Sequence, residues 1–169
     1  MSSFVLKIIA IISMLVDHSG YLIFNSFSFM NYIGRLAFPI FAFLITEGYI
    51  HTSNLKKYFL RLLIFAIISQ IPFVLLFPNG FTLNILFTLA LGLLAITVYN
   101  KLNNKSLGFI FVILCAVLSH FLHFDYGWFG IAIIFIFYIF KQEKSAMNIF
   151  FIITTFINYL YYFAKTLRI

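Results

Sequence analysis

The chain has 169 residues and a net charge of +7, with 64% hydrophobic and only 9% charged residues. Soluble domains carry about a quarter charged residues. This composition therefore argues against a soluble globular protein and indicates an integral membrane protein. The excess positive charge lies in loop lysines, which set membrane topology, and does not indicate a nucleic-acid partner. The single cysteine, Cys115, excludes an internal disulfide and any multi-cysteine metal site.

Long apolar runs separated by polar turns predict an all-α bundle of about seven transmembrane helices, with a range of six to eight. The bundle is expected to be a single domain over residues 1–169, because no linker, repeat or low-complexity segment divides it. The predicted spans lie near residues 4–24, 30–50, 58–77, 82–99, 107–123, 126–140 and 147–164. The sixth span is short, so it is expected to be tilted or only partly inserted. Pro39 and Pro72 are expected to break or kink the second and third spans, and broken helices often border cavities.

Lysine pairs fall in every second predicted loop, and the loops between them carry no lysine. The pairs are Lys56 with Lys57, Lys101 with Lys105, and Lys141 with Lys144. Cytoplasmic loops are enriched in Lys and Arg. The pattern predicts that these three loops and the N-terminus face the cytoplasm. The richness in Phe, Ile, Lys and Asn suggests a bacterial source, so the expected location is a bacterial inner membrane with lipids as the surroundings.

Asp17 and His18 are adjacent in the middle of the first apolar run. An ionisable side chain at bilayer depth costs several kcal/mol, so it seldom persists there without a function. Histidine accepts and returns protons near neutral pH, the usual role of a general base. A purely structural ion pair between Asp17 and Arg35 of the second span is the alternative, and Lys7 is another possible partner for Asp17.

Lys7 lies eleven residues before His18, which is about three helical turns. The two side chains therefore project from nearly the same face, separated by about 16 Å along the axis. Lys7 is placed near the cytoplasmic surface and His18 deeper in the membrane. Such a stripe suits an anionic donor with a long arm, whose phosphates rest at the cation while its reactive end reaches the histidine.

Further polar residues lie in or beside apolar segments and have both structural and functional interpretations. Asn84 and Thr88 form a stripe with Gly92 on the fourth span, which fits a polar cavity wall or a small-residue helix contact. His120 and His123 share a helix face, but two histidines without a nearby carboxylate or cysteine are a weak metal signal, so no metal is expected. Glu47 ends the second span, Asp125 lies in a loop, and Arg61 either contributes to a site or snorkels to the headgroups.

Several segments together resemble the TraX family of membrane proteins, which are associated with acetylating the N-terminus of conjugative pilin. The most specific is Gly34-Arg-Leu-Ala-Phe-Pro39, and the pair Glu47-Gly48 and the triplet Asp125-Tyr126-Gly127 also fit. The remaining matching segments are Leu6–His18, Tyr58–Pro72 and Leu83–Thr88. TraX proteins in turn look related to the broader membrane acyltransferases, which are associated with a basic residue, ten intervening residues and a histidine.

The resemblance implies an acetyl-CoA-dependent membrane acetyltransferase. His18 is then the base or the acetyl relay, with Asp17 and Arg35 as further catalytic residues. Lys7 and Arg35 contact the donor. The cationic residues Lys57 and Arg61 face the cytoplasm, where they suit its phosphates. Glu47, Asn84, Thr88, Asp125 and Tyr126 are polar residues with substrate-binding or structural roles. The acceptor is an amine on a pilin-like peptide, or a hydroxyl on an envelope glycan.

Two other classes fit the same residues. Intramembrane Asp, His, Arg and Glu also form proton relays in transporters, although this chain is short and lacks the internal repeats of many transporters. A non-catalytic subunit of a conjugation or secretion apparatus is the third class. It predicts that substitutions at Asp17, His18 and Arg35 are tolerated as long as packing is preserved.

Overall fold

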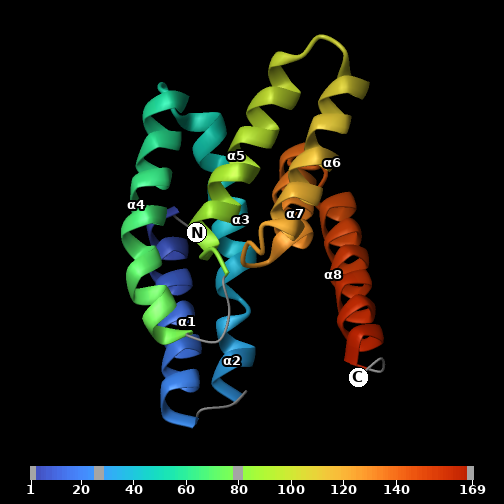
Figure 1. Cartoon of the computed structure of the whole chain (residues 1–169). Helices are drawn as coiled ribbons and strands as arrows, with labels where there is room; N and C mark the ends of the chain where they lie inside the picture. Colours follow the sequence, from blue (N-terminus) through green and yellow to red (C-terminus); the bar gives the residue numbers. More distant parts are fainter. Residues whose placement is uncertain (1–2, 25–28, 78–81, 167–169) are drawn as a thin grey trace.

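The computed structural model describes residues 3–24, 29–77 and 82–166. Within those ranges the chain forms helices and one isolated backbone bridge, between Leu83 and Phe124, so the predicted all-α class is confirmed. The helices are α1 (Ser3–Phe24), α2 (Phe29–Gly34), α3 (Ala37–His51), α4 (Leu55–Leu76), α5 (Ile85–Lys101), α6 (Lys105–Phe121), α7 (Gly127–Ile139) and α8 (Lys144–Thr166) (Figure 1).

The predicted second span consists of two helices, because the chain breaks at Arg35 and Leu36 between α2 and α3. Pro39 explains the position of the break. A proline cannot donate a hydrogen bond to the residue four positions earlier, here Arg35, and its ring clashes with that carbonyl. In the first turn of α3 the missing N–H costs nothing, since the first N–H groups of a helix have no intrahelical partner. The predicted third span differs, because α4 continues through Pro72.

Helices α3, α5 and α7 form the centre of the bundle. Their buried side chains make the main core cluster, which includes Phe38, Ile45, Leu89, Ile96 and Ile133. Around this centre α1 packs on α2 and α3, α4 packs on α5, α6 packs on α5 and α7, and α8 packs on α7 (Figure 1). Gly92 lies where α5 meets α7, and a Cβ at this position would collide with Ile134. It is thus a small-residue helix contact, one of the two interpretations of its stripe.

The three lysine-bearing loops lie at the same end of the bundle. Glu47 near the end of α3 forms an ion pair with Lys141 after α7, with 3.3 Å between charged atoms. The Asn100 amide at the end of α5 donates to the Tyr49 hydroxyl of α3 at 2.9 Å. The C-terminal ends of α3, α5 and α7 are therefore side by side. This arrangement agrees with the lysine pattern, whose cytoplasmic assignment remains a prediction.

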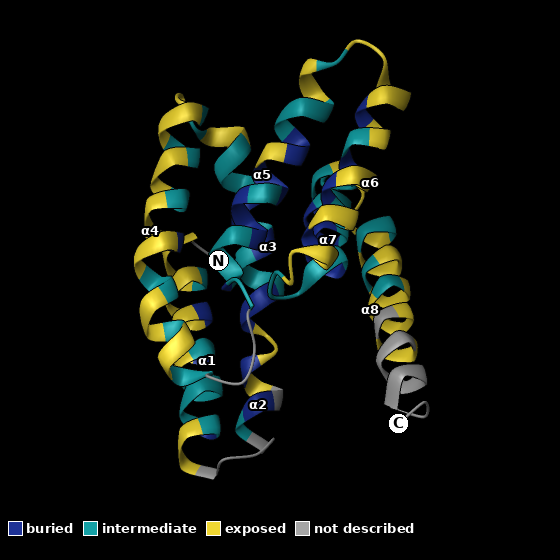
Figure 2. Cartoon of the chain, in the orientation of Figure 1, coloured by how far each residue is buried: buried dark blue, intermediate teal, exposed yellow. Residues whose placement is uncertain are grey.

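Apolar side chains cover much of the outer surface. Exposed examples are Leu75 of α4 and Phe121 of α6, at 78% and 72% of their maximal accessible area. Figure 2 shows exposed residues along the outward faces of α1, α4, α6 and α8. By length and composition, α1 and α4 could each cross a bilayer. These features indicate association with a membrane.

Candidate functional site

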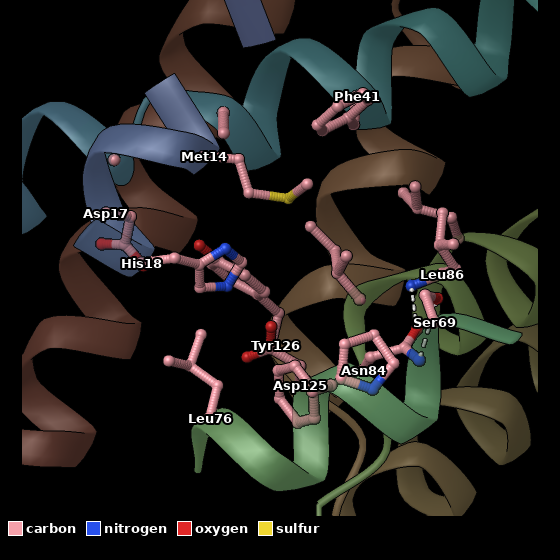
Figure 3. Close-up of a pocket in the computed structure, with 16 residues that line it drawn as sticks. Met14, Asp17, His18, Phe41, Ser69, Leu76, Asn84, Leu86, Asp125 and Tyr126 are labelled. Atoms are coloured by element: carbon pink, nitrogen blue, oxygen red, sulfur yellow. Dashed lines mark hydrogen bonds between the residues drawn. The ribbon is translucent and has the colours of Figure 1, made fainter. Parts of the chain in front are cut away.

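A pocket of about 290 Å³ lies where α1, the junction of α2 and α3, α4, the start of α5 and the loop between α6 and α7 meet. Its polar lining residues are Asp17 and His18 from α1, Ser69 from α4, Asn84 from the start of α5, and Asp125 and Tyr126 from the loop. Figure 3 shows the side chains of His18 and Asp125 in the same part of this pocket, with Tyr126 beside them. Ionisable residues more than a hundred positions apart in the sequence thus share one cavity.

Asp17 is held against α2. Asn31, which is fully buried, donates through its amide to the Asp17 carboxylate at 3.0 Å and to the Asp17 backbone carbonyl at 3.1 Å. Gly34 lies directly under the Asp17 side chain, so that a Cβ at this position would collide with it. In Figure 3 the Asp17 carboxyl points away from the imidazole of His18. Asp17 therefore fixes the position of α1 and contributes its charge to His18 as a neighbour.

Replacing Gly34 with alanine should displace Asp17 and destabilise the junction of α1 and α2. Forcing an extra carbon into a packed contact typically costs about 1–3 kcal/mol. We expect the melting temperature in detergent to fall by several degrees, together with a loss of whatever activity His18 supports. Unchanged melting and activity in the variant would contradict the close contact.

His18 projects from α1 toward the centre of the pocket (Figure 3). Its ring lies 5.6 Å from the ring of Phe77, which ends α4, and Tyr21 meets the same phenylalanine edge-on at 5.2 Å. These contacts attach α1 to the end of α4. They leave the His18 imidazole partly buried in the pocket wall, the position required of a proton acceptor.

Asp125 is presented by a loop whose backbone is fixed on both sides. The Leu83 carbonyl accepts from the Asp125 N–H at 2.8 Å, and the Leu83 N–H donates to the His123 carbonyl at 3.0 Å. The Thr88 hydroxyl of α5 donates to the Asp125 carbonyl. His123 and Tyr126 have φ angles of 53° and 64°, which cost non-glycine residues energy and often mark functional sites. The loop holds Asp125 in place at the expense of local strain.

The Tyr126 ring stacks on Phe38 of α3, with 4.0 Å between ring centroids. Phe38 is fully buried, and Tyr126 immediately precedes the first residue of α7. The stack joins the loop to the core of the bundle. It explains how a single loop between α6 and α7 can have a fixed position at the pocket.

Burial raises the pKa of the Asp125 carboxyl to about 6, and the Arg35 guanidinium opposes this shift. An unfolded aspartate titrates near 3.9. Because the folded chain holds the proton more tightly, the stability that Asp125 contributes is present at low pH and is lost as pH rises through about 6.

We therefore expect the melting temperature of the wild type to fall, relative to Asp125→Asn, as pH rises from about 4 to about 6. Above that range the difference should stay constant. Melting curves of both proteins in one detergent would measure it. Parallel curves across the whole range would show that Asp125 is not buried as described.

Asn84 lines the pocket, but its hydrogen bonds are used within the protein. Its amide donates to the Ala66 carbonyl at 2.8 Å, the Gln70 Oε1 at 2.8 Å and the Ser69 hydroxyl at 3.3 Å. Its Oδ1 accepts from the Leu86 N–H at 3.0 Å and so caps α5. Asn84 is buried and joins α4 to α5. Its role in the structure is to hold the wall of the pocket.

Comparison with known proteins identifies the family. The model of the family described as "TraX protein" matches residues 2–166, nearly the whole chain. The chain belongs to the TraX family. All of the pocket residues named above lie inside the matched range.

Two curated relatives resemble this TraX chain over part of their length. The probable fimbrial assembly protein FimC, serogroup H1, of Dichelobacter nodosus is 41% identical over 113 residues, covering 57% of this chain and 46% of the relative. An uncharacterized protein of Rickettsia prowazekii (strain Madrid E) is 31% identical over 148 residues, covering 85% of this chain and 58% of the relative. The chain thus spans about half the length of these relatives. No solved structure matches.

Two residues of the specific TraX segments lie away from the pocket lining. Arg35 stands at the break between α2 and α3 and is exposed, close enough to Asp125 to influence its pKa. Glu47 lies at the opposite end of the bundle, where it pairs with Lys141 and, at 3.4 Å, with His51. Its contacts join α3 to the segment after α7.

The predicted donor-binding cations Lys7, Lys57 and Arg61 are exposed and lie nearer the other end of the bundle than His18 does. Helices α1 and α4 run in the same direction (Figure 1), and His18 is level with Phe77. A helix rises about 1.5 Å per residue, so the position of each cation along the axis follows from its distance in sequence from His18 or Phe77. By this measure Arg61 lies about 7 Å farther than Lys7 from the level of His18, and Lys57 lies about 14 Å farther than Lys7. Lys7 also shares the helix face of Met14 and His18, both of which line the pocket.

Asn31 and Gly34 were missed as site residues by sequence reasoning, although Gly34 opens the most specific TraX segment. Asn31 looks like an ordinary polar residue near a span end, and only its contact with Asp17 reveals its role. Gln70 was missed as well, and it carries part of the Asn84 network. Gln70 could have been noticed in the sequence, because it is a polar residue inside an apolar span.

Proposed function

We propose that this TraX chain is a multi-pass membrane acetyltransferase that moves an acetyl group from acetyl-CoA to an amine or hydroxyl acceptor. The observation that supports the proposal is the pocket itself, whose lining includes His18, Asp17 and Asp125. A histidine that shares a partly enclosed pocket with carboxylates is suited to general-base catalysis. The TraX resemblance supplies the reaction type.

In this proposal the acceptor nitrogen or oxygen attacks the thioester carbonyl while His18 removes its proton. A bond from the acceptor to the carbonyl carbon forms, the carbon–sulfur bond breaks, and the proton passes to the departing thiolate. Asp17 and Asp125 stabilise the positive charge that His18 acquires. Arg35 lies near enough to favour the ionised form of Asp125, because its positive charge lowers the pKa of that carboxyl. An acetyl group carried transiently on His18 is an alternative route through the same residue.

Acetyl-CoA supplies an activated acyl group and three anionic phosphate positions. We place its phosphates at the lysine-bearing end, where Lys57, Arg61 and Lys56 are exposed on the first turns of α4. Lys7 lies between this end and the pocket on the face that leads to Met14 and His18. The proposed orientation has this end in the cytoplasm and the N-terminus on the same side.

The acceptor is proposed to be a peptide of a surface-fibre apparatus. This part of the proposal rests on the relative named as a fimbrial assembly protein and on the pilin association of the TraX resemblance. The alternative acceptor is an envelope glycan, which would react through a hydroxyl group. The chain spans about half the length of these relatives, so the binding partners of the whole protein are also part of this proposal.

The test is saturable turnover of acetyl-labelled acetyl-CoA by the purified protein in detergent, by hydrolysis or by transfer to an added peptide. We expect turnover that depends on protein concentration and is absent after heat denaturation. A folded protein that neither binds nor turns over acetyl-CoA would refute the proposal. A proton flux in proteoliposomes that requires His18, without coenzyme A binding, would establish a transporter instead.

A further inference from the structure

The pocket continues past its ionisable groups into an apolar chamber. This chamber is defined by Met14 of α1, Phe41 of α3, Phe73 of α4, and Leu86 and Leu89 of α5. In Figure 3, Met14 and Phe41 lie along one side and Leu86 lies at the end away from Asp17. His18 and Asp125 therefore stand beside one end of an apolar space.

The polar groups on the chamber wall, Ser69 and Asn84, already hydrogen-bond within the protein. The Ser69 hydroxyl donates to the Phe65 carbonyl at 2.6 Å and accepts from Asn84. The Asn84 amide is used by Ala66, Ser69 and Gln70. A polar ligand group placed here would lose its water without gaining a partner, which is costly. An apolar group loses nothing by entering.

The pocket of which the chamber is part is also larger than an acetyl group requires. The whole pocket measures about 290 Å³, the volume of roughly ten water molecules at about 30 Å³ each. An acetyl group has only three heavy atoms. A pocket of this size with apolar walls beside ionisable groups suits a ligand component with an apolar part.

We propose that the apolar chamber binds an aliphatic group of about four to six carbons attached next to the reacting atom. This inference rests on the proposed function, and it sets the substrate class of the same site. Two parts of the substrates could carry such a group. One is the acyl chain of the donor, which would then be longer than acetyl, and the other is the first side chain of a peptide acceptor.

Two substrate series distinguish these sources. The donor series is acetyl-, butyryl- and hexanoyl-CoA with one acceptor. The acceptor series is a pair of tripeptide amides that begin with leucine or serine, with acetyl-CoA as donor. We expect kcat/KM to rise at least tenfold with apolar size in one series, since a methylene in an apolar pocket is worth about 10- to 200-fold. The series that responds identifies the source, and ratios within threefold in both series would overturn the proposal.

Filling the chamber should remove the preference. We expect Leu86→Trp to lower the apolar-to-polar kcat/KM ratio at least tenfold, and Met14→Trp to do the same from the opposite wall. Leu94→Trp, two turns along α5 at a position 36% exposed, is the matched control and should keep the ratio. If both chamber variants fold and keep the full preference, the chamber is not the binding site.

A binding measurement separates this inference from the acetyltransferase proposal. The probe is n-hexylamine, with ethanolamine as its polar counterpart, and the readout is the melting temperature in detergent. Stabilisation of the wild type by n-hexylamine alone, lost in Leu86→Trp, supports the chamber even if no acyl-CoA is turned over. Turnover of acetyl-CoA with neither n-hexylamine binding nor any size preference would overturn the chamber while leaving the acetyltransferase intact.

Discussion

Replacing His18 with alanine should lower the rate of acetyl transfer by about 10²- to 10⁴-fold, the usual contribution of a general acid–base residue. The His18 side chain faces the pocket, and histidine is the usual general base in enzymes. The variant should remain folded, because the contacts of this ring are with Phe77 at the rim of the bundle. Turnover of labelled acetyl-CoA measures the effect.

His51→Ala is the matched control for this variant. His51 is exposed, stands at the opposite end of α3 from the break, and pairs with Glu47. A surface pair of this kind contributes about 0–1 kcal/mol, so the control should keep wild-type turnover. If His18→Ala retains activity in a folded protein, the general-base role is wrong. Equal losses in both variants would point to a general effect on folding.

Replacing Asp125 with asparagine should lower acetyl transfer by about 10- to 10³-fold, less than the loss of the base itself. Asparagine keeps the size of the side chain but removes the negative charge that stabilises protonated His18. The backbone contacts of the loop with Leu83 and Thr88 stay in place, because they use main-chain atoms of residue 125. The loss should therefore appear in kcat, in a variant that melts no lower than the wild type above pH 6, where the buried Asp125 carboxylate costs the wild type stability.

Two further variants separate charge from loop position. Glu143→Gln removes an exposed carboxylate from the loop after α7 and should leave turnover unchanged. Thr88→Val removes the hydroxyl that holds the Asp125 carbonyl and should cost about 1 kcal/mol of stability, with a smaller fall in turnover. If Thr88→Val is as inactive as Asp125→Asn, loop position rather than the carboxylate charge controls the reaction.

Local rules predicted much of the fold. Apolar length and polar turns located the predicted spans to within a few residues, although the second span is divided into α2 and α3. Asn54, Asn84 and Asn104 cap α4, α5 and α6, as such residues usually do. Pro39 indicated the break before α3. The outcome at Pro72 could not be read from the sequence, because whether a proline breaks a helix depends on the packing around the freed carbonyl.

The candidate site was predictable only in part. The sequence identified Asp17, His18 and Asp125 as unusual, because charged residues are rare in apolar segments. The sequence could not show which of these residues lie close together. The position of Asp17 depends on the packing of α1 on α2, and the position of Asp125 depends on the backbone bridge to Leu83. The separation of Glu47 from the pocket depends in the same way on tertiary contacts at the other end of the bundle.

The most direct test of a shared site is a double-mutant cycle between His18 and Asp125, read by transfer of labelled acetyl groups from acetyl-CoA. Residues that act as a unit have non-additive effects. We predict measurable turnover by the wild type and a double variant, His18→Ala with Asp125→Asn, that is no slower than His18→Ala alone. Losses that multiply in the double variant, or a folded wild type without turnover, would contradict a single acetyl-transfer site built from these two residues.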